Sequence, residues 1–277
     1  MTMSQTEASI TALEDKAKAL RRHVVEMVTA AKSGHPGGSL SAADILAALY
    51  FGGVLRHDPA NPHAADRDRF IMSKGHAVPV LYAALAEAGY FPIAQLLTLR
   101  KLGSPLQGHP SKADFPIMEA STGSLGMGLS VGMGMALAAK IKHEDYKVYV
   151  MLGDGEAEEG QVWEAAMSAA ARKLNNLIAI LDYNKCQLDG TIAEILNWEP
   201  VVDKWVAFGW HVIEINGHNM AEILQAFEEA KGVTDKPVCI VANTIKGEGV
   251  SFMACNNEWH GKAPTADECA RALAELA

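Results

Sequence analysis

The 277-residue chain is poor in the features that mark several specialised classes of protein. Its four cysteines include no C-x-x-C pair, which disfavours a disulfide framework and fits reduced thiols in the cytoplasm. Its formal net charge is −9, whereas nucleic acid and anionic membranes attract basic surfaces. The longest uncharged stretch, residues 120–139, contains five glycines and fits a buried helix better than a membrane span. We expect no signal peptide, because the first 20 residues carry five charges and no apolar core. We therefore expect a cytoplasmic protein whose main partners are neither nucleic acid nor a membrane.

What the sequence does contain is an alternation of strand-like and helix-like patterns. Short apolar strand candidates lie at 70–72, 147–152, 177–181, 211–215 and 238–242. Patterns with helical spacing lie at 9–31, 41–50, 81–88, 123–140, 159–173, 201–208 and 219–231. This alternation predicts the α/β class, with a three-layer domain in which a mostly parallel sheet is flanked by helices. We expect residues 1–8 to form a flexible tail and residues 9–277 to form a single domain.

Two local patterns add detail to this outline. Ser41 is a candidate cap for the helix at 41–50, because Asp44 then falls in the first turn, where an acid suits the helix dipole. Residues 103–120 hold glycine, proline and serine without periodicity, which predicts a long loop of the kind that is often functional.

Glycine flanks five of the ten histidines, which is more than its ordinary abundance gives by chance. They are His35, His76, His109, His218 and His260. Glycine lets backbone approach a ligand closely, and histidine supplies a donor, an acceptor or a proton near neutral pH. Any one of them alone fits a structural turn, but as a set they favour a site for a polyanion or a sugar phosphate. Zinc is the rival ligand, although no two of these histidines have the H-x-H or i, i+4 spacing.

A glycine turn that carries an acid follows the strand candidate at 147–152. Neither a Walker loop nor a dinucleotide-binding loop is present; instead Asp154 stands between two glycines, shortly before the helix expected from about Glu159. A strand, a glycine turn and a helix N-terminus form a common phosphate site, but an acid beside a phosphate needs a cation between them. Asn184 ends the next strand, and adjacent parallel strands would bring it to the same edge as Asp154. The pair indicates an Mg²⁺ site that bridges to a diphosphate, whereas a lone G-D-G is more often an ordinary turn.

The G-D-G…N unit resembles the thiamine-diphosphate (TPP) motif, and other segments resemble the transketolase family. The matching segments, in chain order, are residues 33–39, 73–77, 107–110, 121–126, 153–155 with 159–160, 244–247 and 258–264. The match resembles the N-terminal, diphosphate-binding half (the PP domain) of a full transketolase, as found in the N-terminal subunit of split, two-gene enzymes. It implies a separate C-terminal subunit that carries the pyrimidine-binding half, an α2β2 heterotetramer, and sugar-phosphate substrates of carbohydrate metabolism.

The resemblance also assigns roles to residues. The metal, Mg²⁺ or else Mn²⁺ or Ca²⁺, would be bound by Asp154, Asn184 and the carbonyl of Cys186. The cofactor TPP would be held by His76, Gly123, Ser124, Leu125, Gly155, Glu156, Asn184 and His260. Catalytic contacts would come from His35, His109, His260 and Glu159, with Glu164 close to Glu159 at a subunit interface. The implied reaction is ping-pong transfer of a two-carbon ketol unit from a ketose phosphate to an aldose phosphate.

Several alternatives stay open at this point. One is a subunit of another TPP enzyme, such as 1-deoxyxylulose-phosphate synthase or a 2-oxoacid dehydrogenase, and another is a non-catalytic TPP-binding subunit. A generic nucleotide-binding protein is disfavoured because the sequence lacks a lysine loop that would grip a phosphate. The donor sugar is also open, because contacts to the substrate phosphate would come largely from the second subunit.

The segment at 123–140 combines small residues with an apolar stripe. Its glycines are Gly126, Gly128, Gly132 and Gly134, and its stripe is Met127, Val131 and Met135. The glycines would let another helix approach closely, either within the same domain or from a partner chain. We expect part of this face to pack against the partner chain.

Overall fold

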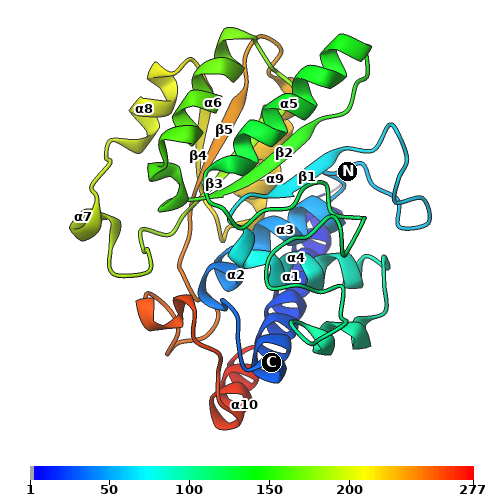
Figure 1. Cartoon of the computed structure of the whole chain (residues 1–277), viewed down its shortest axis with the longest axis vertical. Helices are drawn as coiled ribbons and strands as arrows, with labels where there is room; N and C mark the ends of the chain where they lie inside the picture. Colours follow the sequence, from blue (N-terminus) through cyan, green and yellow to red (C-terminus); the bar gives the residue numbers. More distant parts are fainter. Residues whose placement is uncertain (1–2) are drawn as a thin grey trace.

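The computed structural model describes residues 3–277, and its five strands form one sheet in which every neighbouring pair is parallel (Figure 1). The strand order is β1-β2-β3-β5-β4. The strands are β1 (Arg69–Met72), β2 (Val148–Gly153), β3 (Leu177–Tyr183), β4 (His211–Asn216) and β5 (Val238–Asn243). Each agrees with a strand expected from the sequence to within two residues at either end.

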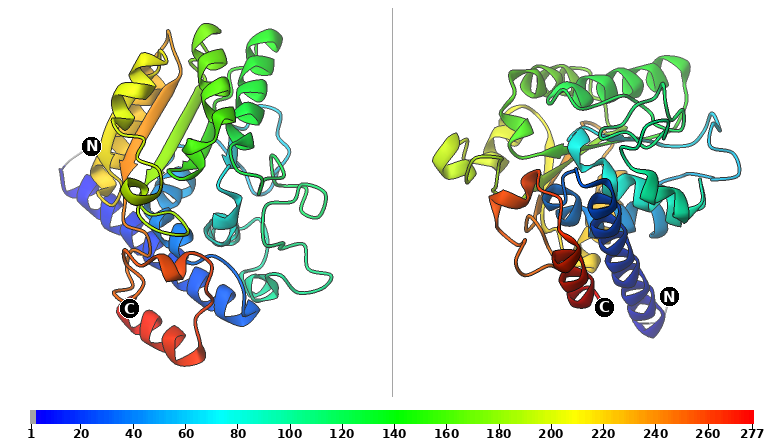
Figure 2. Two further views of the ribbon diagram at one scale, coloured as in Figure 1. Left: turned by 60° about the vertical axis from the view of Figure 1, so that its left-hand side comes forward. Right: turned by 60° about the horizontal axis from the view of Figure 1, so that its bottom comes forward.

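Helices cover both faces of this sheet, as Figures 1 and 2 show. The longer ones are α1 (Met3–Ala31), α3 (Ala43–Phe51), α4 (Val78–Glu87), α5 (Met127–Lys142), α6 (Gly160–Ala171), α8 (Val201–Ala207), α9 (Met220–Gly232) and α10 (Ala266–Glu275). Alternate strand residues enter two separate cores: Tyr149 and Ile178 pack with α1, α3, α4 and α9, whereas Val150 and Ala179 pack with α5, α6 and α8. The three-layer α/β fold with a parallel sheet is therefore confirmed.

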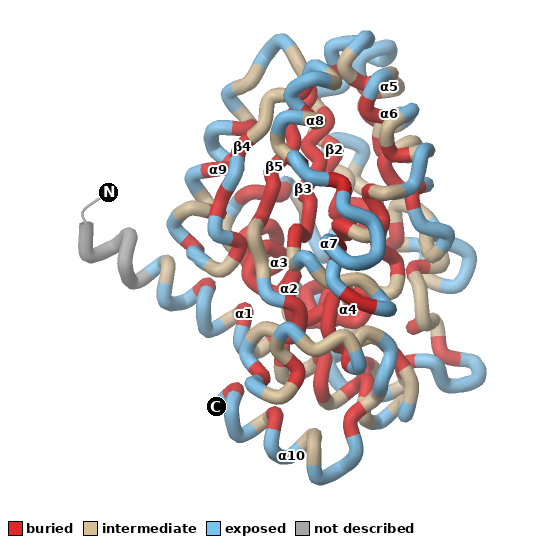
Figure 3. The backbone as a smooth tube through the Cα atoms, turned by 90° about the vertical axis from the view of Figure 1, so that its left-hand side faces the viewer, coloured by how far each residue is buried: buried red, intermediate tan, exposed pale blue. Residues whose placement is uncertain are grey.

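The central strands are apolar because both of their faces are covered. β2 and β3 are buried along their whole length, and β5 along all but its last residue (Figure 3). Shorter elements surround the sheet: α2 (Gly37–Ser41), α7 (Ile192–Ile195), η1 (Gly75–Ala77), η2 (Ile93–Thr98), η3 (Glu156–Glu158) and η4 (Asn257–His260). Residues 103–120 contain no helix or strand, in agreement with the long loop expected there.

The N-terminal part of the chain differs from expectation at two places. Helix α1 begins at Met3, whereas the helix was expected to begin at residue 9, and residues 1–2 lie outside the described part. The capping role expected for Ser41 is wrong, because Ser41 ends α2 and Ala42 is the N-cap of α3. The Ser41 hydroxyl instead lies 2.6 Å from Oδ2 of Asp182, to which it donates a hydrogen bond within the core.

Most glycines of α5 lie against other parts of this chain. A Cβ atom on Gly128 would lie 2.2 Å from Oγ of Ser73, and one on Gly132 would lie 2.4 Å from Cγ2 of Val150. These two positions let α5 pack closely against the strands of its own domain, and Gly126 has a similar contact with Glu159. These glycines therefore support the alternative in which α5 packs within its own domain. Gly134 is the exception, because a Cβ placed there would meet no neighbouring atom within 4 Å.

Among residues 3–277, no helix combines the length and the apolar character that crossing a bilayer requires.

The two glycines Gly132 and Gly134 provide a matched test of how α5 is packed. Alanine at either position raises helix propensity by about 1 kcal/mol, but only at Gly132 does the new methyl group overlap a buried side chain. We expect Gly134→Ala to raise the free energy of unfolding by about 0.5–1 kcal/mol, and Gly132→Ala to lower it by about 1–3 kcal/mol. Urea unfolding of the two variants and the parent chain measures both, and equal effects of the two substitutions would contradict the packing described.

Candidate functional site

The carboxyl ends of β2 and β3 bring together the two residues that the sequence paired. Gly153 at the end of β2 is in register with Asp182 on β3, so Asp154 and Asn184 follow at the same edge of the sheet. Oδ2 of Asp154 accepts a hydrogen bond from the backbone N of Lys185 at 2.5 Å. Oδ1 of Asn184 accepts one from the backbone N of Cys186 at 3.1 Å. The adjacency inferred from the strand order is therefore confirmed.

A pocket of about 190 Å³ opens at this edge of the sheet. Eight residues with a predicted cofactor or metal role line it: His76, Leu125, Asp154, Gly155, Glu156, Asn184, Cys186 and His260. The rest of its lining is Gly38, Lys74, Gly153, Gln187, Leu188 and Lys246, to which the sequence assigned no role. The structure therefore gathers most of the predicted site, together with two lysines that the prediction lacked.

Four of the five glycine-flanked histidines form a cluster beside this pocket. The ring of His35 lies 5.4 Å from that of His76, 6.0 Å from that of His109 and 5.6 Å from that of His260, measured between centroids. The rings of His76 and His260 are 5.0 Å apart. Nδ1 of His35 is buried and has no hydrogen-bond partner in the described part of the chain. His218, the fifth glycine-flanked histidine, lies elsewhere and bonds to a different set of groups.

Burial keeps all four clustered histidines neutral at pH 7. Desolvation is the main cause at each, and nearby cations add to it. Burial and the charge of Arg100 lower the pKa of His35 to about 4, and burial and the charge of Lys246 lower that of His260 to about 3. The pKa values of His76 and His109 are lowered in the same way, with Arg100 beside His109. The cluster therefore presents neutral imidazoles, each of which has one nitrogen that donates a hydrogen bond and one that accepts.

The zinc alternative gains no support from this cluster. Across the described residues, no three His, Cys, Asp or Glu side chains come together in a group that could hold a metal ion. The oxygens of Asp154, Asn184 and the Cys186 carbonyl are instead of the hard type that Mg²⁺ prefers.

The remaining predicted residues lie around the pocket rather than in its lining. Gly123 (φ +138°) packs against the ring of His109, at 3.2 Å from the position of a Cβ. Ser124 is exposed next to it. Glu159, the N-cap of α6, is exposed and lies against Gly126, and Glu164 is exposed on the same helix.

Glu156 shapes the pocket through its own hydrogen bonds. Its buried carboxylate accepts bonds from the backbone N of Gly126 and of Gly153, both at 3.0 Å, and from Oγ of Ser73 at 2.5 Å. These bonds tie the loop before α5 to the end of β2. Both carboxylate oxygens of Glu156 are thus engaged by its own chain, so it holds the pocket wall in place.

A buried ion pair lies at the pocket wall, formed by Lys74, which lines the pocket, and Asp182, which does not. Nζ of Lys74 donates to Asp182 and, at 2.8 Å, to the carbonyl of Gly38. Asp182 also accepts hydrogen bonds from Ser41, Thr244 and Asn184. Burial opposes its ionisation, but Lys74 and these donors outweigh that effect and hold the pKa of Asp182 below its usual range.

Lys246 is the functional candidate that the sequence reasoning missed. It is only 2% exposed, and its Nζ lies 3.1 Å from the carbonyl of Cys186, 2.9 Å from that of Gln187 and 2.9 Å from Nδ1 of His260. These acceptors are all neutral, and burial lowers the pKa of this lysine. The signal was available, because Lys74 and Lys246 both precede a glycine inside the segments that carry the family resemblance.

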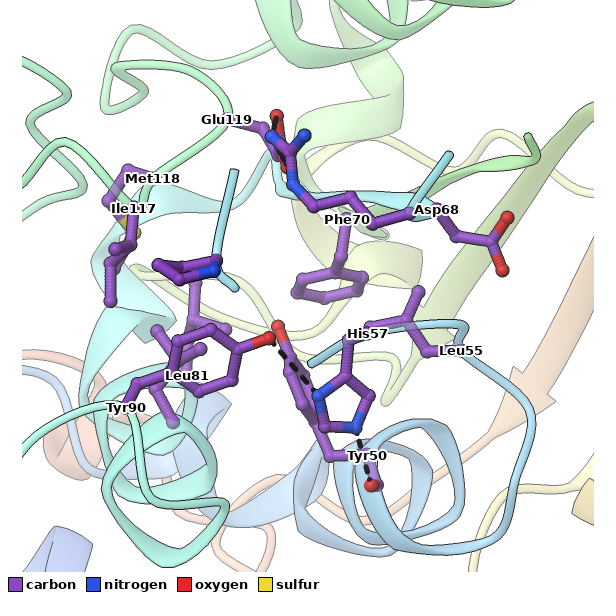
Figure 4. A pocket seen from close by; sticks show the side chains of 13 residues that line it. Tyr50, Leu55, His57, Asp68, Phe70, Leu81, Tyr90, Ile117, Met118 and Glu119 are labelled. Atoms are coloured by element: carbon purple, nitrogen blue, oxygen red, sulfur yellow. Dashed lines mark hydrogen bonds and ion pairs between the residues drawn. The ribbon is translucent and has the colours of Figure 1, made fainter. Parts of the chain in front are cut away.

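A second cavity, of about 40 Å³, lies between α3, α4 and β1 (Figure 4). Its polar groups bond to one another: His57 contacts the hydroxyl of Tyr90 at 3.1 Å and the carbonyl of Tyr50 at 2.9 Å, and Arg67 pairs with Glu119 at 2.7 Å. This space holds little more than a water molecule, and its lining contains none of the predicted site residues. The predicted site residues therefore gather at the pocket described above and not at this cavity.

The fold and this pocket define an α/β protein whose predicted cofactor and metal residues gather in a pocket at the carboxyl edge of its parallel sheet. Residues 13–276 match the family model described as the thiamine diphosphate binding domain of transketolase. The chain belongs to the transketolase family, and the resemblance inferred from its sequence motifs is confirmed.

Proteins of similar length are among its relatives. The 6-deoxy-6-sulfo-D-fructose transketolase subunit SqwG of Clostridium sp. (strain MSTE9) is 47% identical over 95% of this chain and 96% of that protein. An apulose-4-phosphate transketolase subunit of Phocaeicola vulgatus is 44% identical over 95% of this chain and 93% of that protein. The crystal structure of transketolase from Campylobacter jejuni superposes with a TM-score of 0.90 at 35% identity, over 95% of this chain and 42% of that one. The chain thus spans less than half of a full-length transketolase and nearly all of the separate subunits.

The buried carboxyl of Asp154 predicts a pH dependence for the metal-free chain. Burial, followed by the charge of Asp182, raises its pKa from 3.8 to about 7. The folded chain therefore holds an extra proton between about pH 4 and pH 7, and its free energy of unfolding falls as the pH rises through that window. The loss is on the order of 4 kcal/mol for this group alone.

The variant Asp154→Asn removes that titration. We expect it to be more stable than the parent chain at about pH 8 and closer to it at about pH 4, as measured by urea unfolding with a chelator present. The exposed Asp203→Asn on α8 is the control and should follow the parent. A stability difference between Asp154→Asn and parent that does not change with pH would contradict the raised pKa.

Proposed function

We propose that the chain is one subunit of a two-chain transketolase, which transfers a two-carbon ketol unit from a ketose phosphate to an aldose phosphate. The observation that carries the proposal is one pocket in which Asp154, Asn184 and the Cys186 carbonyl lie beside Lys246 and His260. The relatives of similar length are named as transketolase subunits, which supports the same reading. The names of these relatives favour a transketolase over the other TPP enzymes considered from the sequence.

The pocket fits a metal-bound diphosphate by the chemistry of its donors. The oxygens of Asp154, Asn184 and the Cys186 carbonyl would hold Mg²⁺, with Mn²⁺ or Ca²⁺ as substitutes. A divalent cation there would favour the ionised form of the buried Asp154 carboxyl. His76, His260, Gly155 and Asn184 would hold the diphosphate, with Lys246 as the buried cation that offsets its charge.

The histidine cluster beside the pocket is suited to binding a sugar. When bound, TPP supplies the electron sink that cleavage of a carbon–carbon bond beside a carbonyl requires. His35, His109 and His260 would hydrogen-bond substrate hydroxyls and move protons to and from the reacting oxygens, which neutral imidazoles do well. Nδ1 of His35, buried and unpartnered among the described residues, is a free position for such a bond. Gly123, Ser124 and Leu125 would border the cofactor, and Glu159 would meet the partner subunit.

The substrate class follows from the relatives and from charge. Two relatives are named for 6-deoxy-6-sulfo-D-fructose and for apulose 4-phosphate, so each name specifies a ketose with an anionic group. We infer a donor of that kind, within either the pentose phosphate route or a dedicated catabolic pathway for a less common ketose. A cytoplasmic location fits the four cysteines, none of which is paired.

Reconstitution with a second subunit that carries the pyrimidine-binding half tests the function. We expect ketol transfer from a panel of ketose phosphates and sulfonates only when both chains, TPP and Mg²⁺ are present. Asp154→Ala should weaken binding of TPP with Mg²⁺ by about 100-fold or more, because it removes a metal ligand. Calorimetry and a transfer assay measure the two effects, with the exposed Asp203→Ala as the control.

Each component of the proposal has its own opposing result. Full activity of this chain alone as a stable monomer would contradict the two-chain enzyme. Full activity of Asp154→Ala in the reconstituted pair would favour a non-catalytic TPP-binding subunit. Consumption of pyruvate without ketose cleavage would favour another TPP enzyme.

The partner would dock on the apolar surface around the pocket, in an α2β2 assembly. Leu125, Met127 and Val131 are exposed there, as is Leu188 in the loop after β3, whereas Met135 is half-buried against the core. This exposed stripe continues the rim of the pocket, because Leu125 and Leu188 also line it. The residues of the stripe would therefore lie where two chains complete one site.

Charge substitution tests this docking surface. Met127→Asp and Val131→Asp place a carboxylate in the proposed interface, and we expect each to weaken association with the second subunit by about 10-fold or more. Leu102→Asp, at a fully exposed position after η2, should leave it unchanged. Analytical ultracentrifugation of the mixed subunits measures the association, and an equal effect of all three would contradict the assignment.

A further inference from the structure

His218 is the glycine-flanked histidine that the cofactor pocket does not contain. It lies in the turn between β4 and α9, with a side chain that is 15% exposed. Its Nδ1 lies 2.7 Å from Oδ2 of Asp44, and its Nε2 accepts a hydrogen bond from the backbone N of Ile245 at 2.8 Å. Because Nε2 accepts, the proton of a neutral ring is on Nδ1, where Asp44 accepts it. Both ring nitrogens are thus committed to the protein's own groups.

Asp44, one of the two partners of His218, is fixed by an ion pair between two helices. Arg21 on α1 contacts both oxygens of Asp44 on α3, at 3.2 Å from Nη1 and 2.5 Å from Nη2. The two side chains are 7% and 9% exposed. Burial opposes ionisation of Asp44, but the hydrogen bond from His218 and the charge of Arg21 together lower its pKa. The imidazole therefore has a rigid, ionised anchor in the helical layer.

The other partner of His218, Ile245, is next in the chain to a residue that lines the pocket. Ile245 is followed by Lys246, whose Nζ lies on the carbonyls of Cys186 and Gln187 and on Nδ1 of His260. The neighbours of this pair have other anchors: Thr244 donates to Asp182, and the backbone N of Gly247 donates to the carbonyl of Gly37 at 3.0 Å. Among the described residues, the backbone of the pair itself makes three hydrogen bonds: the N of Ile245 donates to His218, the carbonyl of Ile245 accepts from Glu248 at 3.1 Å, and the carbonyl of Lys246 accepts from Cys255 at 2.9 Å. The bond to His218 is the one that ties the pair to the turn between β4 and α9.

We propose that His218 is a positioning residue, which holds the Ile245–Lys246 backbone so that the Lys246 ammonium is directed into the diphosphate site. The inference rests on the proposed function for the role of Lys246 toward the cofactor. Within residues 3–277, His218 is not part of the pocket lining and makes no ring contact with the histidine cluster, so its link to the pocket is the hydrogen bond from Ile245. The acceptor at Nε2 is the part of the side chain that does this.

Two amide variants separate the two ends of the imidazole. His218→Gln can put an oxygen near the position of Nε2 and so keep the acceptor for Ile245, whereas His218→Asn can keep a donor to Asp44 and loses that acceptor. In the two-chain enzyme, we expect His218→Asn to weaken binding of TPP with Mg²⁺ by about 5–10-fold, and His218→Gln by less than about 3-fold. Calorimetric titration measures both, with the thermal midpoint recorded for each variant.

A double-mutant cycle shows whether the effect passes through Lys246. We expect Lys246→Met alone to weaken TPP binding, and His218→Asn in the Lys246→Met background to add less than about 2-fold. Equal losses from His218→Asn in the two backgrounds would overturn the proposal. So would equal losses from His218→Asn and His218→Gln, because a merely structural role does not distinguish the acceptor.

A third measurement separates this inference from the proposed function. In the chain without cofactor, His218→Asn should speed hydrogen exchange at the Ile245 amide and change the acylation rate of Lys246, whereas His218→Gln should leave both close to the parent. Unchanged exchange and acylation in His218→Asn would overturn the positioning role, even if TPP binds as proposed. Failure of the parent two-chain enzyme to bind TPP or inorganic diphosphate would contradict the proposed function, while exchange and acylation would still decide the role of His218.

Discussion

The buried carboxylate of Asp182 is the constraint on which the rest of this site depends. Its desolvation is offset by Lys74, which follows β1, by Ser41 on α2 and by Thr244, which follows β5. Each of these donors comes from a different element, so one charge joins several segments at the carboxyl edge of the sheet. Removal of a partner would leave an uncompensated charge in the core, which is far more costly than loss of a surface contact.

This anchoring explains how an acidic protein builds a site for an anionic ligand. The chain has a net charge of −9, but Lys74 and Lys246 are buried at the pocket, and Arg100 lies beside His35 and His109. Lys74 is neutralised by Asp182, whereas Lys246 contacts only neutral acceptors. Asp154 and Glu156 line the same pocket, so a bound cation would be needed to make its balance of charge positive toward an anionic ligand, and burial keeps the histidines neutral. Local groups, rather than the net charge, decide what this pocket attracts.

Strands and helices were predictable from the sequence, because each depends on the pattern of residues within its own segment. All five strands and the longer helices between them follow from hydrophobic periodicity, because both faces of a parallel sheet must be apolar. Short elements such as α7 do not, because they have too few residues to show a period. The adjacency of Asp154 and Asn184 followed from one strand–helix–strand step. The role of Ser41 was not predictable in this way, because its hydroxyl serves Asp182, which lies 141 residues away, rather than its own helix. The glycines of α5 suggest a contact for another helix, whereas Gly128 and Gly132 meet Ser73 and Val150.

The sequence by itself determined the order of strands and helices along the chain and the family to which the chain belongs. It also determined which motif residues gather at one edge of the sheet. Only the tertiary structure decided which charges meet: Lys246 reaches the carbonyl of Cys186 across 60 residues, and His218 reaches Asp44 across 174. Local spacing carries no information about such contacts, because they depend on how helices from opposite ends of the chain pack on one sheet. The same packing left His218 outside the histidine cluster, although its glycine neighbour looks the same in the sequence.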